Sequence, residues 1–392
     1  MDSSEIDLGF PFRWYVEGEA RFLAPVFETT SVGEPKSPTK TPVFYNPYSK
    51  LSRDMTVMLL ESFGMEGLVA AEPLGGSGVR GIRLLLETSK VKKVVLNDIN
   101  SKAVKVMEIN SRVNNVLDRV EITHGDANIF LALRSPSELR FSYVDIDPVG
   151  SPTRFLENGL RACRTGGLIG VSATDLASLV GRHPAACLKK YDALTFSCDF
   201  SKEIALRILA GYVVRAGMPL NIAATPRLSI YHRHFIRVFL SVERGRGRCL
   251  RLLERLGWLQ FCSECLSIRT YRITEPPGGR CQDCGKPART AGPLWHGPLH
   301  DPDLISSMMD RDGRYLEAGR LLKKAAGELD LPGFLTVRTL AKRLSLPPVS
   351  PHRVVEALRE RGFRASLTHV DPEGFKTDAS LDEVAKVMAS LV

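Results

Sequence analysis

The sequence predicts an α/β protein with a doubly wound, mostly parallel sheet, followed by a smaller C-terminal α+β domain that contains a zinc ribbon. Strand-like and helix-like segments alternate between about residues 66 and 245, which is the pattern of a parallel sheet covered by helices. Four of the strand-like segments end at or just before an acidic residue, and two Cys-x-x-Cys pairs stand fifteen residues apart further along the chain. These three observations predict the fold class and place its candidate sites.

The first strand of the predicted sheet, residues 68–72, leads into a glycine-rich turn and a helix. The strand ends in Glu72, the turn contains Gly75 and Gly78, and apolar residues of the next segment share one helical face. Glycines let the backbone approach a ligand, and a helix N-terminus favours an anionic group. The carboxylate of S-adenosylmethionine would suit this place, although such turns also serve dinucleotides or no ligand at all.

Acidic residues end the next two strands as well. Residues 92–98 end in Asp98, roughly 20 residues past the glycines, where a carboxylate can bind two ribose hydroxyls. Residues 120–124 are followed by Asp126 and Ala127, where an acid can reach an adenine amino group. Each acid alone is more often a helix cap or a solvated strand end, but Glu72, Asp98, Asp126 and Asp147 in this order, with helices between them, are hard to obtain by chance.

The segment Phe141–Pro152 carries the most informative motif. An apolar strand, residues 141–146, stops at Asp147-Pro148-Val149-Gly150, because such a sequence cannot continue a central strand. Related Asp-Pro motifs at this place are typical of methyltransferases that act on amino groups. A carboxylate and the following carbonyl accept the two N–H groups of an exocyclic amine, aim its lone pair at a methyl sulfonium and take the proton. The alternative is an Asx-type turn without chemistry.

The cysteines fall into two groups. Cys262, Cys265, Cys281 and Cys284 have the spacing of a zinc ribbon, and four thiolates complete a closed, structural tetrahedral Zn²⁺ site without a catalytic role. Disulfides, which a reducing cytosol disfavours, and iron in place of zinc are the alternatives. The other cysteines lie among apolar or mixed neighbours and are expected to be structural thiols.

The rest of the chain is divided around these motifs. Residues 1–245 are expected to form the catalytic domain, with residues 1–40 as irregular wrapping or a mobile loop, and residues 246–392 a second domain. Within it the ribbon spans about 258–290. A helix–turn–helix–hairpin pattern at about 333–380 suggests a winged-helix-like module with a basic side, or an ordinary solvated face: Arg338, Lys342, Arg343, Arg353, Arg359, Arg361 and Arg364.

Composition limits the partners. A net charge of +9 and a pI near 9.2 suit a polyanionic partner such as nucleic acid, although general basicity without a target is common. No apolar run approaches the length of a membrane span, and residues 1–7 lack a secretion signal. We therefore expect a cytoplasmic protein, with no membrane association and no obligate protein partner.

These residues together resemble the tRNA (guanine(26)-N(2))-dimethyltransferase family of archaeal type. The resemblance spans nearly the whole chain and rests on a specific combination of segments: Pro42–Pro47, Arg53–Asp54, Gly78–Arg83, Asn97–Asp98, Gly125–Ala127, Asp145–Pro152, Ser172–Asp175, His183–Pro184, Tyr191, Gly297–Leu299 and Gly374–Thr377. It implies a class I, Rossmann-like S-adenosylmethionine methyltransferase domain and a C-terminal domain that helps to hold tRNA.

The same resemblance implies the reaction and the roles of single residues. The reaction is one or two methyl transfers to the exocyclic amine of guanosine 26. Asp147 would be the catalytic acid, Pro148 would offer its carbonyl, and Phe44 would stack on the base. Arg53, Arg80, Asp98, Asp126 and Ala127 would contact the cofactor, beside the Glu72, Gly75 and Gly78 of the glycine turn.

One residue departs from the family pattern. The family usually has an aromatic residue after the Asp-Pro pair, where this chain has Val149. Valine offers apolar contact but no π face, so a two-sided clamp on the base is in doubt, whereas the cofactor site is not. The alternative functions are methyl transfer to an amine of another RNA, of DNA or of a protein glutamine, and a nucleic-acid-binding module that has lost activity. The intact set of strand-end acids argues against the latter.

Overall fold

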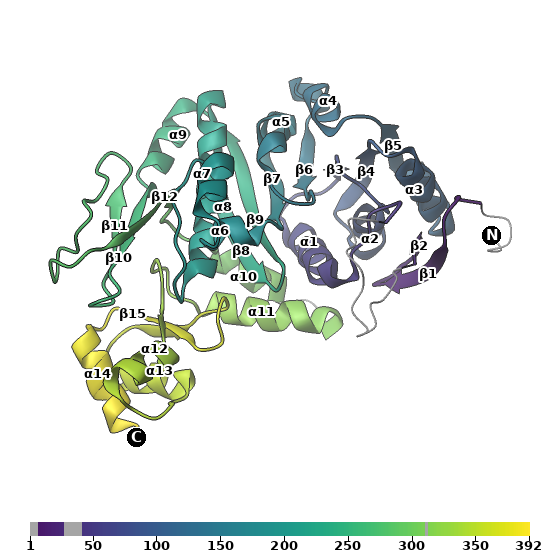
Figure 1. Cartoon of the computed structure of the whole chain (residues 1–392). Helices are drawn as coiled ribbons and strands as arrows, with labels where there is room; N and C mark the ends of the chain where they lie inside the picture. The colour runs from purple at the N-terminus through teal and green to yellow at the C-terminus, as the bar shows by residue number, and fades with distance from the viewer. Residues whose placement is uncertain (1–6, 27–40, 310–312) are drawn as a thin grey trace. The chain divides into compact units, whose positions relative to one another are not determined.

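A computed structural model of the chain describes residues 7–26, 41–309 and 313–392 (Figure 1). Contacts group the chain into two compact units. Unit 1 comprises Met1–Val171, Ser241–Glu243 and Asp310–Ala318, and unit 2 comprises Ser172–Leu240, Arg244–Met309 and Gly319–Val392. The domain boundary near residue 245 stays a prediction.

The described residues form a seven-stranded sheet in the order β5-β4-β3-β6-β7-β9-β8. Parallel pairs join β3 to β4 and β6, β4 to β5, and β6 to β7, which confirms the doubly wound prediction. From β3 the chain builds outward in one direction and then restarts on the other side with β6. Ligands bind beyond the carboxyl ends of the strands at such a switch point. The strands are β3 Leu68–Glu72, β4 Val91–Asp98, β5 Val120–His124, β6 Phe141–Ile146, β7 Cys163–Ala173, β8 Ile222–His232 and β9 Phe235–Arg244.

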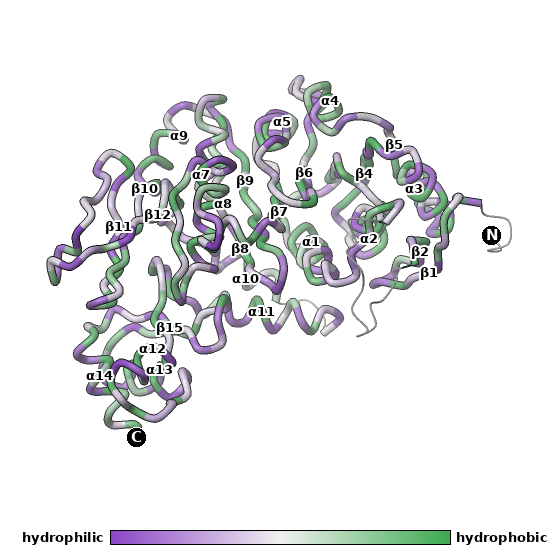
Figure 2. Tube along the Cα trace, viewed as in Figure 1, coloured by the Kyte–Doolittle hydropathy of each residue, from purple (hydrophilic) through white to green (hydrophobic). Residues whose placement is uncertain are grey.

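Helices alternate with the strands of unit 1, as the sequence predicts. Every residue of β6 is buried, which explains its continuous apolar run. Figure 2 shows hydrophobic stretches along the sheet strands, whereas outer helices such as α11, Leu316–Ala326, alternate in colour. The helices that follow the strands, with α1 before them, are α1 Lys50–Ser62, α2 Val79–Glu87, α3 Ser101–Val113, α4 Ala127–Ala132 and α5 Leu156–Ala162.

The N-terminal region differs from the expectation of irregular chain. Strands β1, Phe12–Glu17, and β2, Ala20–Pro25, form an antiparallel hairpin. Gly18 supplies the positive φ, 58°, that a tight hairpin turn requires. The hairpin is fixed to α3, because the backbone N–H of Leu23 donates to Asn110 Oδ1 over 2.7 Å. The Pro- and Ser-rich stretch 27–40, which also belonged to that expectation, lies outside the described residues.

Unit 2 is built around α8, Ser201–Gly217, which packs against β8 and β12. An antiparallel sheet in the order β11-β10-β12 carries the cysteine pairs, and a sheet in the order β13-β15-β14 lies in the C-terminal module. The expected order of two helices and a hairpin is present there, and a further helix, α14, ends the chain. The elements are α6 Leu176–Leu179, α7 Pro184–Tyr191, α9 Arg246–Leu253, β10 Leu256–Phe261, β11 Ile268–Arg272, β12 Arg289–Trp295, α10 Pro302–Met309, β13 Leu335–Thr336, α12 Val337–Leu344, α13 Pro351–Glu360, β14 Ala365–Leu367, β15 Gly374–Thr377 and α14 Leu381–Ser390.

Candidate active site

The glycine-rich turn after β3 has a backbone that only glycine fits. Gly76 and Gly78 adopt φ angles of 54° and 72°. A Cβ atom at Gly76 would lie 2.6 Å from the carbonyl oxygen of Phe44, closer than any side chain can approach. The turn is pinned to the end of β4, because the N–H of Gly75 donates to the carbonyl of Asn97 over 2.8 Å. The predicted glycine-rich turn is therefore present, fixed and close-packed, at the carboxyl edge of the sheet, and its contact with a ligand stays a prediction.

The segment that carries Phe44 lies directly against this turn. The N–H of Ser77 donates to the carbonyl of Phe44 over 3.2 Å, and Asn100 Nδ2 donates to the carbonyl of Pro42 over 2.7 Å. The ring of Phe44 remains 40% exposed. The structure thus places the residue predicted to stack on a base beside the predicted cofactor turn, with its ring open to a partner.

Asp98 and Asp126 both lie at the carboxyl edge of the parallel strands, and both hold backbone there. Asp98 accepts the N–H groups of Gly76 and Asn100, each over 2.9 Å. Asp126 caps α4 by accepting the N–H groups of Asn128 and Ile129 through Oδ1. The helix-cap interpretation of Asp126 is therefore correct as far as it goes, and the capping role fixes the carboxylate at the strand end.

Sequence reasoning missed two exposed isoleucines beside these acids. Ile99, directly after Asp98, is 67% exposed, and Ile129, in α4 behind Asp126, is 64% exposed. Single exposed apolar side chains are common on protein surfaces, so what distinguishes these two is their place beside the strand-end acids. The signal was available in the sequence, since an isoleucine in the turn after a strand-end acid serves no core. Apolar side chains at this edge could pack against a ring such as adenine, and that contact stays a prediction.

Two aspartates near the end of β6 differ in exposure. The side chain of Asp145 is 1% exposed and that of Asp147 is 29% exposed. Arg80 of α2 forms ion pairs with both carboxylates. Asp147 is therefore the carboxylate that a ligand can reach, and Asp145 belongs to the packing beneath it. This geometry favours Asp147 over Asp145 for the chemical role.

The residues after Asp147 turn away from the sheet. Pro148 is buried, Val149 is 56% exposed, and Gly150 has a φ of 90°. The chain leaves the strand at Asp147 as predicted, and the turn exposes Val149. Whether Val149 and Phe44 face the two sides of one base stays a prediction.

Arg53 has a structural partner in addition to its predicted role. Its Nε and Nη2 donate to the two oxygens of Glu17, both over 2.6 Å, and the residue is 5% exposed. Arg83, fully buried in α2, bonds the same carboxylate over 2.7 Å. Burial alone would raise the pKa of Glu17, but Arg53 and Arg83 outweigh burial and hold that pKa at about 2. This network ties β1 to α1 and α2, and the contact of Arg53 with a cofactor stays a prediction.

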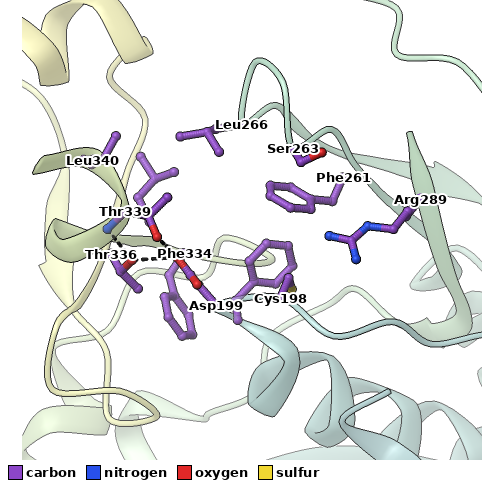
Figure 3. A pocket seen from close by; sticks show the side chains of 12 residues that line it. Cys198, Asp199, Phe261, Ser263, Leu266, Arg289, Phe334, Thr336, Thr339 and Leu340 are labelled. Atoms are coloured by element: carbon purple, nitrogen blue, oxygen red, sulfur yellow. Dashed lines mark hydrogen bonds between the residues drawn. The ribbon is translucent and has the colours of Figure 1, made fainter. Parts of the chain in front are cut away.

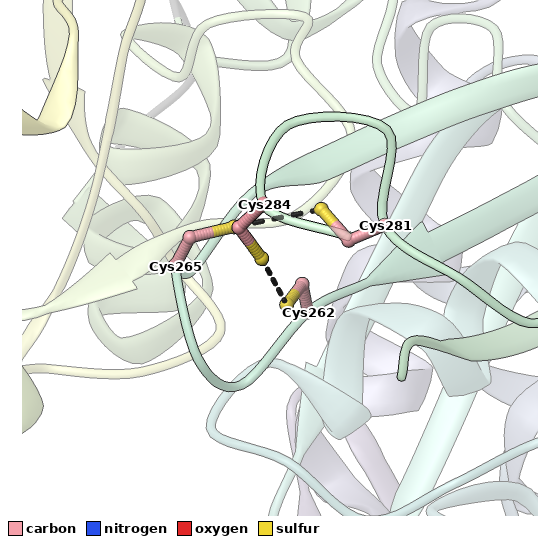
Figure 4. A group of neighbouring side chains, drawn as sticks. All are labelled: Cys262, Cys265, Cys281 and Cys284. Atoms are coloured by element: carbon pink, nitrogen blue, oxygen red, sulfur yellow. Dashed lines mark hydrogen bonds between the residues drawn. The ribbon is translucent and has the colours of Figure 1, made fainter. Parts of the chain in front are cut away.

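The four ribbon cysteines converge in unit 2 (Figure 4). The sulfur atoms of Cys262 and Cys284 are 3.5 Å apart, as are those of Cys265 and Cys281. A disulfide would require about 2.05 Å, whereas thiolates around tetrahedral zinc with bonds of about 2.3 Å lie about 3.8 Å apart. The geometry is that of free thiols arranged as ligands, not of disulfides.

Comparisons with known proteins agree with one another. Residues 18–389 match the family model described as N2,N2-dimethylguanosine tRNA methyltransferase. The chain belongs to this family. A tRNA (guanine(26)-N(2))-dimethyltransferase of Methanopyrus kandleri is 38% identical, over 92% of this chain and 93% of the relative. A tRNA (guanine(26)-N(2)/guanine(27)-N(2))-dimethyltransferase of Aquifex aeolicus is 34% identical, over 96% and 95%.

A solved structure gives the same result for the fold. Trm1 from Pyrococcus horikoshii, in complex with S-adenosyl-L-methionine, superposes with a TM-score of 0.84 at 31% identity, covering 96% of this chain and 99% of that one. The class I methyltransferase prediction is confirmed by this family membership and by the sheet order.

This family member also carries a separate pocket, in unit 2, of about 210 Å³ (Figure 3). Its walls are largely apolar, and Asp199 at its rim accepts hydrogen bonds from Thr336 and Thr339. None of the predicted catalytic, cofactor or base-contact residues lines it.

Among the helices that the structure describes, none has the length and apolar character needed to span a bilayer.

Proposed function

We propose that this protein transfers one or two methyl groups from S-adenosylmethionine to the exocyclic amine of the guanosine at position 26 of tRNA. The observation that carries the proposal is the partly exposed Asp147, followed by Pro148, at the carboxyl end of β6, beside the switch point of the sheet. Membership in the dimethylguanosine family supplies the substrate. A tRNA substrate also implies a cytoplasmic location.

The residues at the carboxyl edge fit S-adenosylmethionine. The glycine turn packs against the backbone of Phe44 and donates the Gly76 N–H to Asp98, so it fixes both residues at the edge where the cofactor would lie. Asp98 suits two ribose hydroxyls and Asp126, with Ala127, the adenine amino group. Glu72, Gly75, Gly78 and Arg80 line the same edge. When bound, the cofactor supplies a methyl group on an electrophilic sulfonium, so no metal is required for the transfer.

The chain's own residues would orient the amine and take its proton. Asp147 Oδ and the Pro148 carbonyl accept the two N–H groups, which holds the nitrogen lone pair in line with the methyl group. Asp147 accepts the proton as the nitrogen becomes acidic. After one transfer the amine keeps one hydrogen, and Asp147 can orient it again if the pocket admits the added methyl group.

The target base has to leave the tRNA core, where it is stacked. Phe44, held beside the glycine turn and 40% exposed, would receive it by stacking. Val149 would give apolar contact on the other face. A base held on one side by a ring and on the other by valine is bound less tightly than one between two rings.

We also propose a closed structural Zn²⁺ at Cys262, Cys265, Cys281 and Cys284. The sulfur separations of 3.5 Å support it, and four protein ligands leave no open position for catalysis.

The C-terminal module would help to hold tRNA, and some of its basic residues already have partners. Arg338 pairs with Glu373, and Arg364 pairs with Asp378. Arg343 donates to backbone carbonyls of the ribbon. Arg338 and Arg364 stay largely exposed, so they can exchange these weak pairs for phosphate, and Lys342 is exposed as well. Binding to tRNA should still weaken steeply with salt, because phosphate contacts release counterions.

One experiment tests the function and separates it from the alternatives. Total unmodified tRNA is incubated with the protein and labelled S-adenosylmethionine, and the labelled nucleoside is then identified and mapped. Dimethylguanosine at position 26 supports the proposal. Label at another tRNA position, or label only in DNA or protein supplied in parallel, assigns a different amino-methyltransferase. No transfer to any of them favours the binding-module alternative.

A further inference from the structure

Unit 2 contains a second group of metal-capable side chains, which shares no residue with the ribbon. It consists of His300 between β12 and α10, Glu328 after α11, and His369 after β14. One donor atom from each lies within 4.8 Å of the others. The imidazole rings have centroids 4.9 Å apart at an interplanar angle of 75°. Two imidazoles on one tetrahedral ion, with bonds of about 2.0–2.1 Å, place their ring centres about 5 Å apart.

Three ring nitrogen atoms of these histidines lack a hydrogen-bond partner among the described residues. They are Nδ1 and Nε2 of His300 and Nε2 of His369, and all three are buried. Buried polar atoms are almost always paired in folded proteins. The nitrogens therefore point to a ligand.

Glu328 orients the His369 ring so that its Nε2 can bind a ligand. His369 Nδ1 lies 2.7 Å from Glu328 Oε2, and the His369 side chain is fully buried. Donation of the Nδ1 proton to the carboxylate leaves Nε2 with its lone pair. Histidines that bind metals usually donate their other ring N–H to a carboxylate in this way.

Lys376 decides which atoms can be ligands. Its ammonium lies 2.9 Å from Glu328 Oε1 and 3.1 Å from Glu203 Oε2, so it neutralises buried carboxylate charge. Glu328 is therefore better suited to orient His369 than to bind a cation directly. Lys376 and Arg207 line the same cavity as His300, so their repulsion also weakens a cation held by the imidazoles. A cavity of about 200 Å³ is lined by His300, Glu328 and Lys376 among others, which leaves room for water.

We propose that His300 and His369 bind a second zinc-class ion through their ring nitrogens, with Glu328 orienting His369 and water completing the coordination. The ion would join the segments at residues 300 and 369 within unit 2. With two protein ligands, the site binds more weakly than the ribbon. The proposal does not depend on methyl transfer.

The test is zinc stoichiometry of the full-length protein, equilibrated with buffered free zinc and separated from unbound metal. Wild type should hold about two zinc ions per chain, one of them in the ribbon. His300→Gln and His369→Gln should each hold one, with unchanged circular dichroism. The matched control, Cys284→Ser, should lose the tighter ion and keep the weaker one. With cobalt as the probe, the ion lost in the histidine variants should show no thiolate charge-transfer band.

Two results would overturn the proposal. One is a wild-type protein that still holds one zinc when free zinc is raised well above the level that fills the ribbon, which assigns the nitrogens to water. The other is a second zinc that both glutamine variants retain, which places it elsewhere. If a glutamine variant fails to fold, wild-type stoichiometry and the cobalt spectrum of Cys284→Ser decide alone: imidazole-type bands support the site, and their absence rejects it.

Discussion

Arg80 pairs with two aspartates, one in β6 and one directly after it: its guanidinium pairs with Asp147, and its Nη1 lies 3.4 Å from Asp145 Oδ2. The same Nη1 donates to Thr56 Oγ1 over 2.9 Å, so α1 also fixes the arginine. The hydroxyl of Tyr143 donates a hydrogen bond to Asp145 Oδ2. Arg80 is also predicted to contact the cofactor, so one side chain would link cofactor binding to the position of the catalytic acid.

Replacement of Asp147 tests this arrangement. Asp147→Ala should lower the single-turnover methylation rate by roughly two orders of magnitude or more, because orientation and proton acceptance are lost together. Cofactor affinity should hardly change, since Arg80 remains. A near-full rate in this variant would show that Asp147 is not the catalytic acid, and Asp145 would become the candidate.

Removal of the Phe44 ring should cost more than removal of the Val149 side chain. Base–aromatic stacking contributes on the order of 1–3 kcal/mol, and Phe44 is the ring that we assign to the base. Phe44→Ala and Val149→Ala should be compared in single-turnover methylation and tRNA binding. Unchanged methylation by Phe44→Ala would exclude the stacking model.

Val149→Phe supplies the ring that the family usually has. Because Val149 is 56% exposed, a phenylalanine has space at the surface and should tighten productive tRNA binding or speed the first transfer. The gain should stay below the upper end of the stacking range, since valine already covers part of the face. A loss of about 1–3 kcal/mol would instead mean that the site is overpacked when tRNA binds.

The lowered pKa of Glu17 predicts that the unfolding free energy of the protein falls in acid. Its pKa is about 2 in the folded protein against 4.5 in the unfolded chain, so its contribution is complete above pH 4.5 and is lost as the pH falls toward 2. Linkage makes that contribution roughly 3 kcal/mol. Glu17→Gln should lower the unfolding free energy by about 3–5 kcal/mol at pH 7 and flatten its decline in acid. Glu157→Gln, which removes an exposed ion pair with Arg161, is the control and should change it by less than about 1 kcal/mol. Equal pH profiles for both variants would contradict the account.

The ribbon zinc predicts a selective effect of chelation. A strong chelator, or Cys262→Ser, should lower the melting temperature of unit 2 and leave S-adenosylmethionine binding in place, because the ribbon lies outside unit 1. Elemental analysis and calorimetry check this. Native protein with four freely titrating thiols and no bound metal would remove the ribbon site.

The sequence predicted the parts of the fold that follow from local pattern. Alternating strands and helices fixed the sheet, and the strand-end acids lie at one edge because parallel strands share their carboxyl ends. The cysteine spacing brought four sulfurs together.

What the sequence could not predict depends on contacts between distant segments. The partner of Arg53 is Glu17, 36 residues away, in a hairpin that was expected to be irregular. The link from Arg80 to Asp147 joins residues 67 apart. Asp145 is buried and Asp147 is partly exposed, and two aspartates two residues apart do not reveal this difference in the sequence. The positions of Ile99 and Ile129 beside strand-end acids are visible in the sequence, but their exposure was not predicted.

The most direct test of the central claim uses two tRNA transcripts that differ by one amino group. One carries guanosine and the other inosine at position 26, so only the exocyclic amine is absent from the second. Single-turnover methylation with labelled S-adenosylmethionine should give dimethylguanosine from the first and no label at position 26 of the second, with similar binding of both. Equal labelling of the two transcripts would contradict the account.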